Sequence, residues 1–390
     1  MRSSVPPSPE AAKVVRPGGL IAILGGGQLG RMTAMAARTM GYRVRVMDPE
    51  AACPASHVVD ETIVGRWDDV AAARRLATGA DAVTLEIEQI GEGALSEVAR
   101  IAPLRPGVAP IRIIQDKTLQ KPWLAEHGFP VGPFRVVRNE AELHEAVRVL
   151  GGSVFLKIGR GGYDGRGQAR IGVADGVDFG EVWKQLGAQP CVAEQALDLD
   201  CEISVMAARN PSGEVRSYPA ARNHHESQIL AWSVLPAGVS PEHETRAEQL
   251  AADISAALGI EGLLCVEAFV TKQGDLFVNE LAPRPHNSYH QSERGCITSQ
   301  FEQLVRTTCN LPLGDTALIS PAAIVNLLGD VWINSPGEPD FAAALAVPGV
   351  RLHLYEKLAP RIGRKMGHLS ATGATAEEAL ARVLEAKRRL

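Results

Sequence analysis

Two glutamates face each other across a predicted hairpin that covers residues 264–281. A two-residue turn, or a centred four-residue turn, pairs Thr271 with Leu276, and counting back along both strands then pairs Glu267 with Glu280. Like charges directly opposite each other across a strand pair are destabilising unless a cation lies between them. Two carboxylates together with polyphosphate oxygens are a common set of Mg²⁺ ligands. The hairpin therefore predicts a magnesium site, and the alternative is that both side chains point to solvent.

A glycine-rich segment, GRGGYDGRGQ at residues 159–168, follows an apolar strand that carries Lys157. It is not a Walker A loop, because no GK[ST] sequence follows. A flexible glycine loop that covers nucleotide phosphates, with a lysine on the preceding strand, is another known solution. The alternative is a mobile surface loop beside an ordinary lysine. Tyr163, Asp164 and Arg166 argue against it, since simple linkers are usually built from glycine and serine.

A second glycine segment, GGGQLG at residues 25–30, fits the GxGxxG pattern between a strand and a helix, and Asp48 ends the next strand. In this context the pattern is typical of dinucleotide binding and suggests NAD. The same backbone amides at a helix N-terminus could instead bind the phosphate or sugar of a substrate. A tight strand–helix turn without a ligand is the third interpretation.

Two further segments carry clustered polar residues. The segment APRPHNSYH, residues 282–290, places Arg284, His286 and Asn287 directly after the hairpin, where two prolines restrict the backbone. The segment RIGRKMGH, residues 361–368, has four basic residues around two glycines before a strand. We interpret it as an anion site or as a solvated basic turn.

The elements that must position these residues change character along the chain. Strand–helix alternation over residues 20–100 predicts a parallel sheet with helical crossovers. The later part predicts mixed strands and helices, including an amphipathic helix at 247–258 that stops at Gly259. The predicted strands are 20–24, 42–48, 81–87, 153–158, 191–197, 202–208, AAIVNLL and VRLHLYE; the other predicted helices are 29–41, 116–128 with Pro122 inside it, and a C-terminal helix with a capping box from Thr375 to Glu378.

Length and composition fit an ordinary globular protein of two or three domains. The 390 residues are 45% hydrophobic and carry a formal net charge of −5, which favours neither a nucleic-acid nor a membrane-surface partner. No apolar run could span a bilayer, and the first residues lack the apolar stretch of a signal peptide. The six cysteines include no CxxC pair, so their spacing indicates neither a zinc site nor a disulfide framework. Together these features predict a cytoplasmic protein with a disordered tail at residues 1–18.

The glycine loop with its preceding lysine, the opposed glutamates and the following NELAPR segment resemble the ATP-grasp ligases. The stretches GGGQLGRM, GGYDGRGQ, NELAPRPHNS, TSQFEQ and GRKMGHL resemble one family within that superfamily, the ATP-dependent carboxylases of purine biosynthesis. This resemblance covers residues 19–390. It implies an ATP- and bicarbonate-dependent carboxylation of aminoimidazole ribonucleotide, a carbon–nitrogen ligase reaction that releases ADP and phosphate.

The resemblance also implies roles for individual residues. The implied catalytic residues are Lys157, Arg166 and Arg284. Implied contacts to ATP come from Lys117, Lys157, Gly162, Tyr163, Asp164, Gly165, Arg166, Gly167, Gln168, Glu194, Gln195, Ala196, Leu197, Glu202, His225, Asn279 and Glu280, with Glu194 to Leu197 at the adenine edge and Glu202 on the ribose. Implied contacts to the ribonucleotide come from Gln28, Leu29, Tyr163, Asp164, Arg166, Arg284, His286, Arg364 and Lys365. The implied magnesium ligands are Glu267, Glu280 and Asn279.

The implied fold is a mixed α/β and α+β ATP-grasp fold. It comprises a Rossmann-like domain at 19–116, a linker helix and mobile lid at 117–195, and a metal-bearing C-terminal domain at 196–390 that ends in a small β-rich module from about 315. The implied cofactor is Mg²⁺. The implied partners are ATP, bicarbonate, aminoimidazole ribonucleotide, a second copy of the chain in a homodimer and, functionally, a downstream mutase.

Three alternatives remain at this point: a related ATP-grasp ligase that uses formate or an amino acid, an NAD-dependent dehydrogenase built on GGGQLG, and a non-catalytic nucleotide-binding regulator. The dehydrogenase would leave the glutamate pair and the second glycine loop unexplained. Retention of Lys157 and both glutamates argues against the regulator. The chain departs from the usual family pattern at Tyr289, Gln89 and Lys117, where glycine, asparagine and arginine are common.

Overall fold

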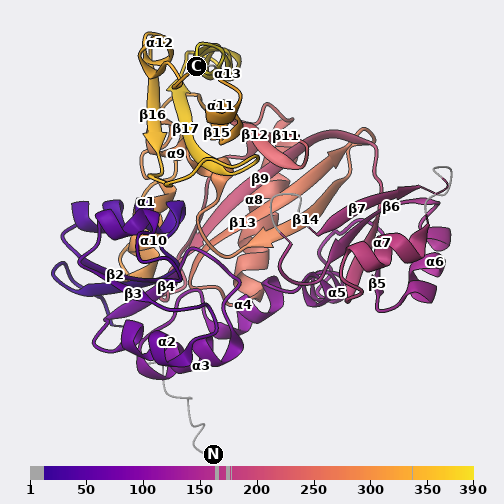
Figure 1. Cartoon of the computed structure of the whole chain (residues 1–390), viewed down its shortest axis with the longest axis horizontal. Helices are drawn as coiled ribbons and strands as arrows, with labels where there is room; N and C mark the ends of the chain where they lie inside the picture. Colours follow the sequence, from indigo (N-terminus) through magenta and orange to yellow (C-terminus); the bar gives the residue numbers. More distant parts are fainter. Residues whose placement is uncertain (1–12, 163–166, 173–175, 177, 336) are drawn as a thin grey trace, which may run out of the picture.

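The computed structural model describes residues 13–162, 167–172, 176, 178–335 and 337–390. Figure 1 shows three bodies around a long central sheet: an N-terminal body in indigo, a lid formed by β5 to β8, and a C-terminal module in yellow. No helix in the described ranges is long and apolar enough to cross a membrane.

The N-terminal body is a four-stranded parallel sheet in the order β3-β2-β1-β4. Strand β1, the run LIAIL, is buried at every position, as expected for a central strand with helices on both faces. Separate apolar clusters therefore form on the two faces. The sheet confirms the predicted parallel arrangement. Its elements are β1 Leu20–Leu24, α1 Gln28–Thr39, β2 Arg43–Asp48, a 3₁₀ turn Pro54–His57, β3 Glu61–Val64, α2 Val70–Ala77, β4 Ala82–Leu85, α3 Glu92–Ile101 and α4 Val108–Ile114.

Part of the predicted disordered tail is ordered, which corrects that prediction. Residues 1–12 lie outside the described ranges, but Val15 is buried beside the N-terminal sheet. Its amide donates to the carbonyl oxygen of Cys309 at 2.9 Å, and its own carbonyl oxygen accepts from the hydroxyl of Tyr42. One apolar side chain with two hydrogen bonds fixes this segment despite its proline-rich surroundings.

Helix α5, Lys117–Glu126, leads from the N-terminal body into the lid. Asp116 caps it by accepting from the amide of Thr118, and Pro122 lies inside the helix, as predicted. The lid is an antiparallel sheet in the order β5-β8-β6-β7, with α6 and α7 packed on an apolar cluster. Its elements are β5 Phe134–Val137, α6 Glu140–Val149, β6 Ser153–Ile158, β7 Gln168–Gly172, α7 Phe179–Gln185 and β8 Cys191–Gln195.

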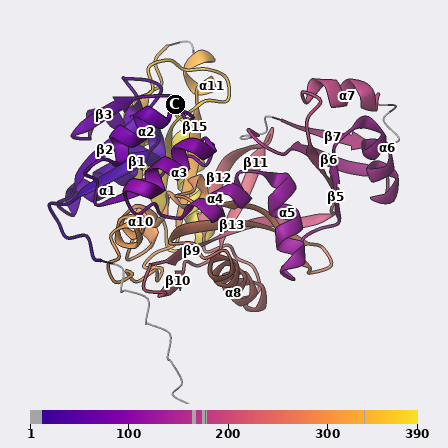
Figure 2. The ribbon, with the colours of Figure 1, turned by 90° about the horizontal axis from the view of Figure 1, so that it is seen from below.

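The rest of the chain forms one large sheet with β14-β13-β9-β11-β12-β15-β17-β16 as its path and β10 paired to β9. Helix α8 begins at Pro241, six residues before the predicted start, because the hydroxyl of Ser240 caps an amide of its first turn. Antiparallel pairing of β12 with β15 makes the C-terminal module a continuation of the central sheet (Figure 2). The elements are β9 Leu199–Arg209, β10 Val215–Ser217, β11 Ala221–Glu226, β12 Ile229–Leu235, α8 Pro241–Ala257, β13 Gly262–Thr271, β14 Leu276–Ala282, a 3₁₀ turn Asn287–Tyr289, α9 Ser292–Gly295, α10 Gln300–Thr308, β15 Ala322–Leu328, α11 Asp330–Ile333, α12 Phe341–Leu345, β16 Val350–Leu354, β17 Lys365–Thr372 and α13 Ala376–Arg388.

The β13–β14 hairpin pairs Glu267 with Glu280, as the sequence predicts, but its register near the turn differs. Leu276 pairs with Val270, so the predicted pairing of Leu276 with Thr271 is wrong. The register shifts by one residue next to Glu267, and this irregularity restores the glutamate pair. An extra residue of this kind is a β-bulge, which re-aims side chains locally. Here the extra residue is Asn279.

Candidate active site

The bulge turns the side chains of Asn279 and Glu280 toward one region of the hairpin. The amide nitrogen of Asn279 lies 3.4 Å from a carboxylate oxygen of Glu267, and Nε2 of His286 approaches that carboxylate at the same distance. Burial raises the pKa of Glu267; His225 opposes this rise, and the nearby Glu280 carboxylate adds to it. Three oxygen-bearing side chains thus meet in one region of the hairpin, and this donor set suits a hard divalent cation.

Two buried lysines share the carboxylate of Glu194 where the lid sheet meets the hairpin. Lys157 Nζ, from β6, lies 2.6 Å from one carboxylate oxygen and donates to Asn279 Oδ1 at 2.9 Å. Lys121 Nζ, from α5, lies 2.7 Å from the other oxygen and donates to the carbonyl oxygen of Val278. Burial alone would raise the pKa of Glu194, but the two ammonium groups lower it to about 2. Glu194 therefore stays ionised and holds both cations in place.

Lys121 is absent from the predicted site residues, although the sequence contains a signal for it. Lys117 and Lys121 lie four residues apart on one helix, where two like charges are unfavourable unless each has its own partner. Lys117 is paired with Glu280, and Lys121 is paired with Glu194. The helix thus places one lysine ammonium group at the predicted metal hairpin and another at the lid.

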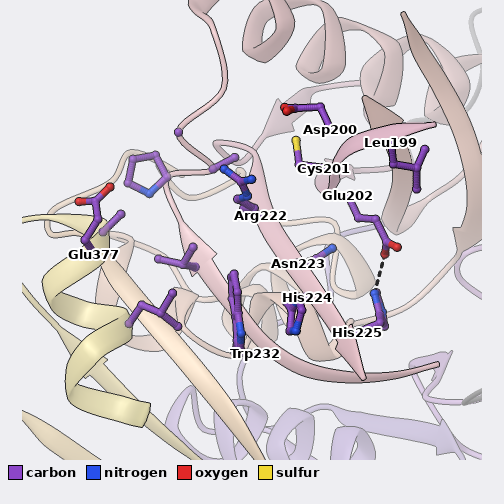
Figure 3. Close-up of a pocket in the computed structure, with 16 residues that line it drawn as sticks. Leu199, Asp200, Cys201, Glu202, Arg222, Asn223, His224, His225, Trp232 and Glu377 are labelled. Atoms are coloured by element: carbon purple, nitrogen blue, oxygen red, sulfur yellow. Dashed lines mark ion pairs between the residues drawn. The ribbon is translucent and has the colours of Figure 1, made fainter. Parts of the chain in front are cut away.

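Glu202 and His225 form an ion pair with 2.6 Å between oxygen and nitrogen, as the dashed line in Figure 3 marks. Burial lowers the pKa of His225, but the hydrogen bond and charge of Glu202 and the charge of Glu267 outweigh burial and raise it. The pair lies at one end of a cavity of ≈470 Å³ that extends past Arg222 to the start of α13. Both residues implied for the nucleotide therefore border open space.

The N-terminal body contributes two carboxylates that the predictions did not include. Glu88 forms a two-pronged ion pair with Arg284, with nitrogen–oxygen distances of 2.5 and 3.2 Å. Burial disfavours the charged Glu88, yet the Arg284 guanidinium lowers its pKa overall. This pair joins the loop after β4 to the segment after β14, so Arg284 is fixed between the two bodies.

The side chain of Glu86, from the loop after β4, lies inside the turn formed by GGGQLG. Its carboxylate accepts hydrogen bonds from the amides of Gly27 and Gly30, and a Cβ atom on Gly25 or Gly27 would collide with the Glu86 side chain. The amide of Gly26 donates to Asp48 at 2.9 Å. These glycines therefore make room for protein carboxylates, which is not the arrangement that the dinucleotide interpretation requires.

The amides of Gln28 and Leu29, which open α1, have no hydrogen-bond partner among the residues that the structure describes. The Leu29 side chain is buried against Met32, Phe301 and Tyr355. If these two residues bind an anion, the backbone amides at the helix N-terminus are the groups available to do so.

The remaining predicted residues divide into those near the hairpin and those outside the described ranges. His286 Nδ1 contacts the hydroxyl of Ser288 at 2.8 Å; burial lowers the pKa of His286 strongly, with further contributions from Arg284 and Lys365. Lys365 is therefore electrostatically close to the site, whereas a guanidinium nitrogen of Arg364 donates to the carbonyl oxygen of Ala359. In the lid, Tyr163, Asp164, Gly165 and Arg166 lie outside the described ranges, while Gly162, Gly167, Gln168, Gln195, Ala196 and Leu197 lie within them.

Gln168 connects the lid to the central sheet. Its side-chain amide donates to Gln228, in the β11–β12 turn, at 2.8 Å. Gly167 next to it has a φ of +73° and no room for a Cβ beside Ile158. The end of the glycine loop is therefore anchored to both the lid strand and the opposite sheet.

The three departures from the usual family pattern differ in their structural role. Tyr289 is fully buried, and its hydroxyl donates to the carbonyl oxygens of Ser204 and Pro219, so it belongs to the core beneath the hairpin. Lys117 pairs with Glu280. Gln89 is partly exposed, and nothing in the structure explains it.

Comparisons with known proteins cover almost the whole chain. Residues 19–115 match the ribonucleotide synthetase preATP-grasp domain, residues 122–301 the ATP-grasp domain, and residues 322–382 the phosphoribosylaminoimidazole carboxylase C-terminal domain. The chain is 40% identical to the N5-carboxyaminoimidazole ribonucleotide synthase of Brucella melitensis over 91% of this chain and 97% of the relative. It is 38% identical to the Bacillus subtilis enzyme of the same name, over 92% of each chain.

Two solved structures point to the same family as these sequence matches. An ADP complex of an N5-carboxyaminoimidazole ribonucleotide synthetase is 37% identical with a TM-score of 0.90, covering 96% of this chain and 97% of that one. The Aspergillus clavatus synthase in complex with ADP and 5-aminoimidazole ribonucleotide is 30% identical with a TM-score of 0.86, covering 96% and 99%.

Proposed function

The chain belongs to the N5-carboxyaminoimidazole ribonucleotide synthases, ATP-grasp enzymes of de novo purine biosynthesis, and from that premise we propose how its residues divide the reaction. The observation that carries the proposal is the meeting of Lys157, Asn279 and Glu280 between lid and hairpin. ATP binds there, with its phosphates against Lys117 and Lys157 and beneath the loop from Gly162 to Gln168.

The nucleoside end of ATP binds along the lid–sheet connection. Residues 194–197 run from the end of β8 toward β9, so their backbone lies between the lid sheet and the central sheet. Glu202 accepts the ribose hydroxyls, and its ion pair with His225 holds the carboxylate in position.

Magnesium binds Glu267, Glu280 and Asn279. The residues fit the ion because they offer oxygen donors, and because burial, together with the Glu280 carboxylate, raises the pKa of Glu267, which a bound cation would counteract. When bound, magnesium would supply positive charge that stabilises the transferred phosphoryl group. Lys117, which pairs with Glu280 in this structure, then turns to the phosphates.

The second substrate, aminoimidazole ribonucleotide, binds on the side of the N-terminal body. Its 5′-phosphate accepts hydrogen bonds from the backbone amides of Gln28 and Leu29, which open a helix. The positive charges of Arg364 and Lys365 also bind this phosphate. Arg284, held by Glu88, and His286 lie between this phosphate site and the hairpin and orient the reacting amine. The described residues thus supply two anion sites flanking one small region.

Bicarbonate is a poor electrophile, and phosphorylation activates it. A bicarbonate oxygen attacks the γ-phosphorus of ATP, ADP leaves, and carboxyphosphate forms. The amine of the ribonucleotide then attacks the carboxyl carbon, or CO₂ released from it, and phosphate leaves as the carbamate forms and the amine loses a proton. Lys157 and the loop amides stabilise the phosphoryl charge, and lid closure keeps water from the unstable intermediate.

The three parts of the chain contribute differently. Residues 19–116 supply the helix N-terminus of the ribonucleotide site, residues 117–195 cover ATP, and residues 196–390 bear the metal and the basic side chains of the ribonucleotide site. The enzyme acts as a homodimer and passes its acid-labile product to a mutase in the next step.

Labelled bicarbonate tests the reaction assignment. ADP release should require aminoimidazole ribonucleotide, and the label should be recovered in stable product only when a mutase is coupled to trap the carbamate. ADP formation at full rate with no trapped label, combined with incorporation of labelled formate, would instead identify the related formate-using ligase.

Removal of either carboxylate tests the magnesium site. Glu267→Gln and Glu280→Gln keep the side-chain shape and remove one metal ligand, so turnover should fall by at least 100-fold while the thermal midpoint changes little. Glu385→Gln, on α13 of the C-terminal module, is the matched control because Glu385 forms only exposed ion pairs with Arg388 and Arg389 on its own helix. Wild-type magnesium dependence in both site variants would refute the assignment.

A further inference from the structure

A cluster of histidines lies outside the residues used above. His353 and His368 stand directly opposite each other on the paired strands β16 and β17. Glu293, on the short helix α9, completes the group, and one ligand atom from each of the three lies within 4.8 Å of the others. Figure 1 shows α9 next to the base of these strands. Three potential metal ligands therefore come from three neighbouring elements.

The two imidazoles are held in defined orientations. Nδ1 of His368 is 2.8 Å from the hydroxyl of Tyr355, which leaves Nε2 as the nitrogen free to coordinate. Its ring stacks against His353 on one side and His290 on the other, with ring centroids 5.1 and 4.6 Å apart. A hydrogen bond that fixes the second ring nitrogen is characteristic of metal-binding histidines.

A buried nitrogen beside the cluster lacks a partner. His290, whose ring stacks on His368, is 1% exposed, and its Nε2 has no hydrogen-bond partner among the described residues.

We propose that Glu293, His353 and His368 bind a divalent transition metal, with Zn²⁺ the best match, at a site separate from the magnesium hairpin. Two imidazoles and one carboxylate favour zinc over magnesium, which takes oxygen ligands almost exclusively. Metal–ligand bonds of 2.0–2.2 Å in tetrahedral geometry would bring the ligand atoms to roughly 3.3 Å from one another. A small side-chain movement from the present separation achieves this.

Access to the site comes through a neighbouring groove. Glu293 and His353 line a cavity of ≈260 Å³ together with Met32 and Met40 of α1. The cysteines would not compete for the metal, because all six are buried. A bound metal would tie the edge strand β16 to α9 and so fix the hairpin whose connection carries Arg364. The site is thus placed to stabilise the C-terminal module next to the proposed phosphate site.

The experiment is a Zn²⁺ titration of the full chain against a chromogenic chelator in the presence of saturating MgADP. Wild-type protein should bind one equivalent of zinc, and Co²⁺ should give a visible absorption band of a low-symmetry site with nitrogen ligands. Glu293→Gln and His353→Gln should each weaken zinc affinity at least 10-fold. Tyr355→Phe keeps the packing but removes the hydroxyl that orients His368, and it should weaken affinity by roughly 10- to 100-fold.

Two matched variants separate this site from others. His224→Gln removes a half-exposed histidine that is 3.6 Å from its own carboxylate partner, Glu226, and should leave zinc affinity unchanged. Glu280→Gln should also leave it unchanged, because that residue belongs to the magnesium hairpin. A thermal midpoint equal to wild type in metal-free buffer shows that each variant is folded. The proposal is overturned if no zinc binds, if His353→Gln binds it normally, or if Glu280→Gln abolishes binding.

Discussion

Replacing Lys157 by methionine removes one charge while keeping most of the side-chain volume. In the structure the ammonium group has two protein contacts, to Glu194 at 2.6 Å and to Asn279 at 2.9 Å. Three N–H groups belong to an ammonium, so one remains for a phosphate oxygen. The methionine variant loses that phosphate contact and also loses the contact that positions Asn279.

The size of the effect follows from the contact to phosphate. A hydrogen bond between charged groups contributes about 1.5–3 kcal/mol. Converted at about 1.4 kcal/mol per factor of ten, this predicts a loss of roughly 10- to 150-fold in kcat/KM for ATP. Global stability should change much less, because Lys121 remains 2.7 Å from Glu194 and keeps that buried carboxylate paired.

The assay is ADP release at saturating bicarbonate and ribonucleotide, with ATP affinity measured separately by equilibrium binding. Lys272→Met is the control, since Lys272 lies in the turn of the hairpin, five residues beyond Glu267 along the chain, and forms an exposed pair with Asp198 at 2.8 Å. Lys157→Met with unchanged ATP affinity and unchanged kcat/KM would refute the role of this lysine. A loss of thermal stability as large as the loss of activity would instead show that its main function is structural.

Two other predictions concern charges around the site. Arg364→Ala and Lys365→Ala should each raise KM for the ribonucleotide at least 10-fold and leave KM for ATP nearly unchanged; a parallel loss of ATP binding would move the basic turn to the nucleotide site. The folded pKa of Glu194, about 2, lies below its ordinary value of 4.5, so its ionisation contributes stability that is complete above pH 4.5 and is lost as the pH falls toward 2. Urea unfolding between pH 5 and pH 2 should therefore show a shallower pH dependence in Glu194→Gln than in wild type, and equal slopes would contradict the inferred pairing.

The local patterns predicted an element correctly where one physical signal dominated. Strand β1 is a continuous apolar run, and α5 has a capping aspartate and a glycine stop, so their positions followed from sequence. Helix α8 starts earlier than the apolar periodicity indicates because its first two turns are polar. Its start is marked by Ser240 and Pro241 instead, a capping signal that the periodicity argument did not use.

The GGGQLG motif shows why a glycine pattern does not identify a ligand. The glycine pattern indicates that some other group comes close to the backbone turn, but it does not identify that group. In this chain the approaching group is Glu86, which comes from a strand end 56 to 59 residues away. Glu86 can be identified as the partner only from the fold, because the pairing of β4 with β1 brings it next to the loop. Glu88, two residues further along the same loop after β4, contacts Arg284 beyond β14, and no local pattern contains this contact between residues 196 positions apart.

The glutamate pair was predicted correctly through a turn register that is wrong, and the difference explains how the site is built. In a regular strand, neighbouring side chains point to opposite faces of the sheet, so Asn279 and Glu280 could not both reach one cation. Without the bulge, the register beside the turn would place Glu267 opposite Asn279. With it, Asn279 contacts Lys157 and Glu267, while the next residue, Glu280, pairs with Glu267 and contacts Lys117. One inserted residue therefore brings Glu267, Asn279 and Glu280 together on a strand pair that would otherwise alternate, which is the arrangement that the proposed magnesium site requires.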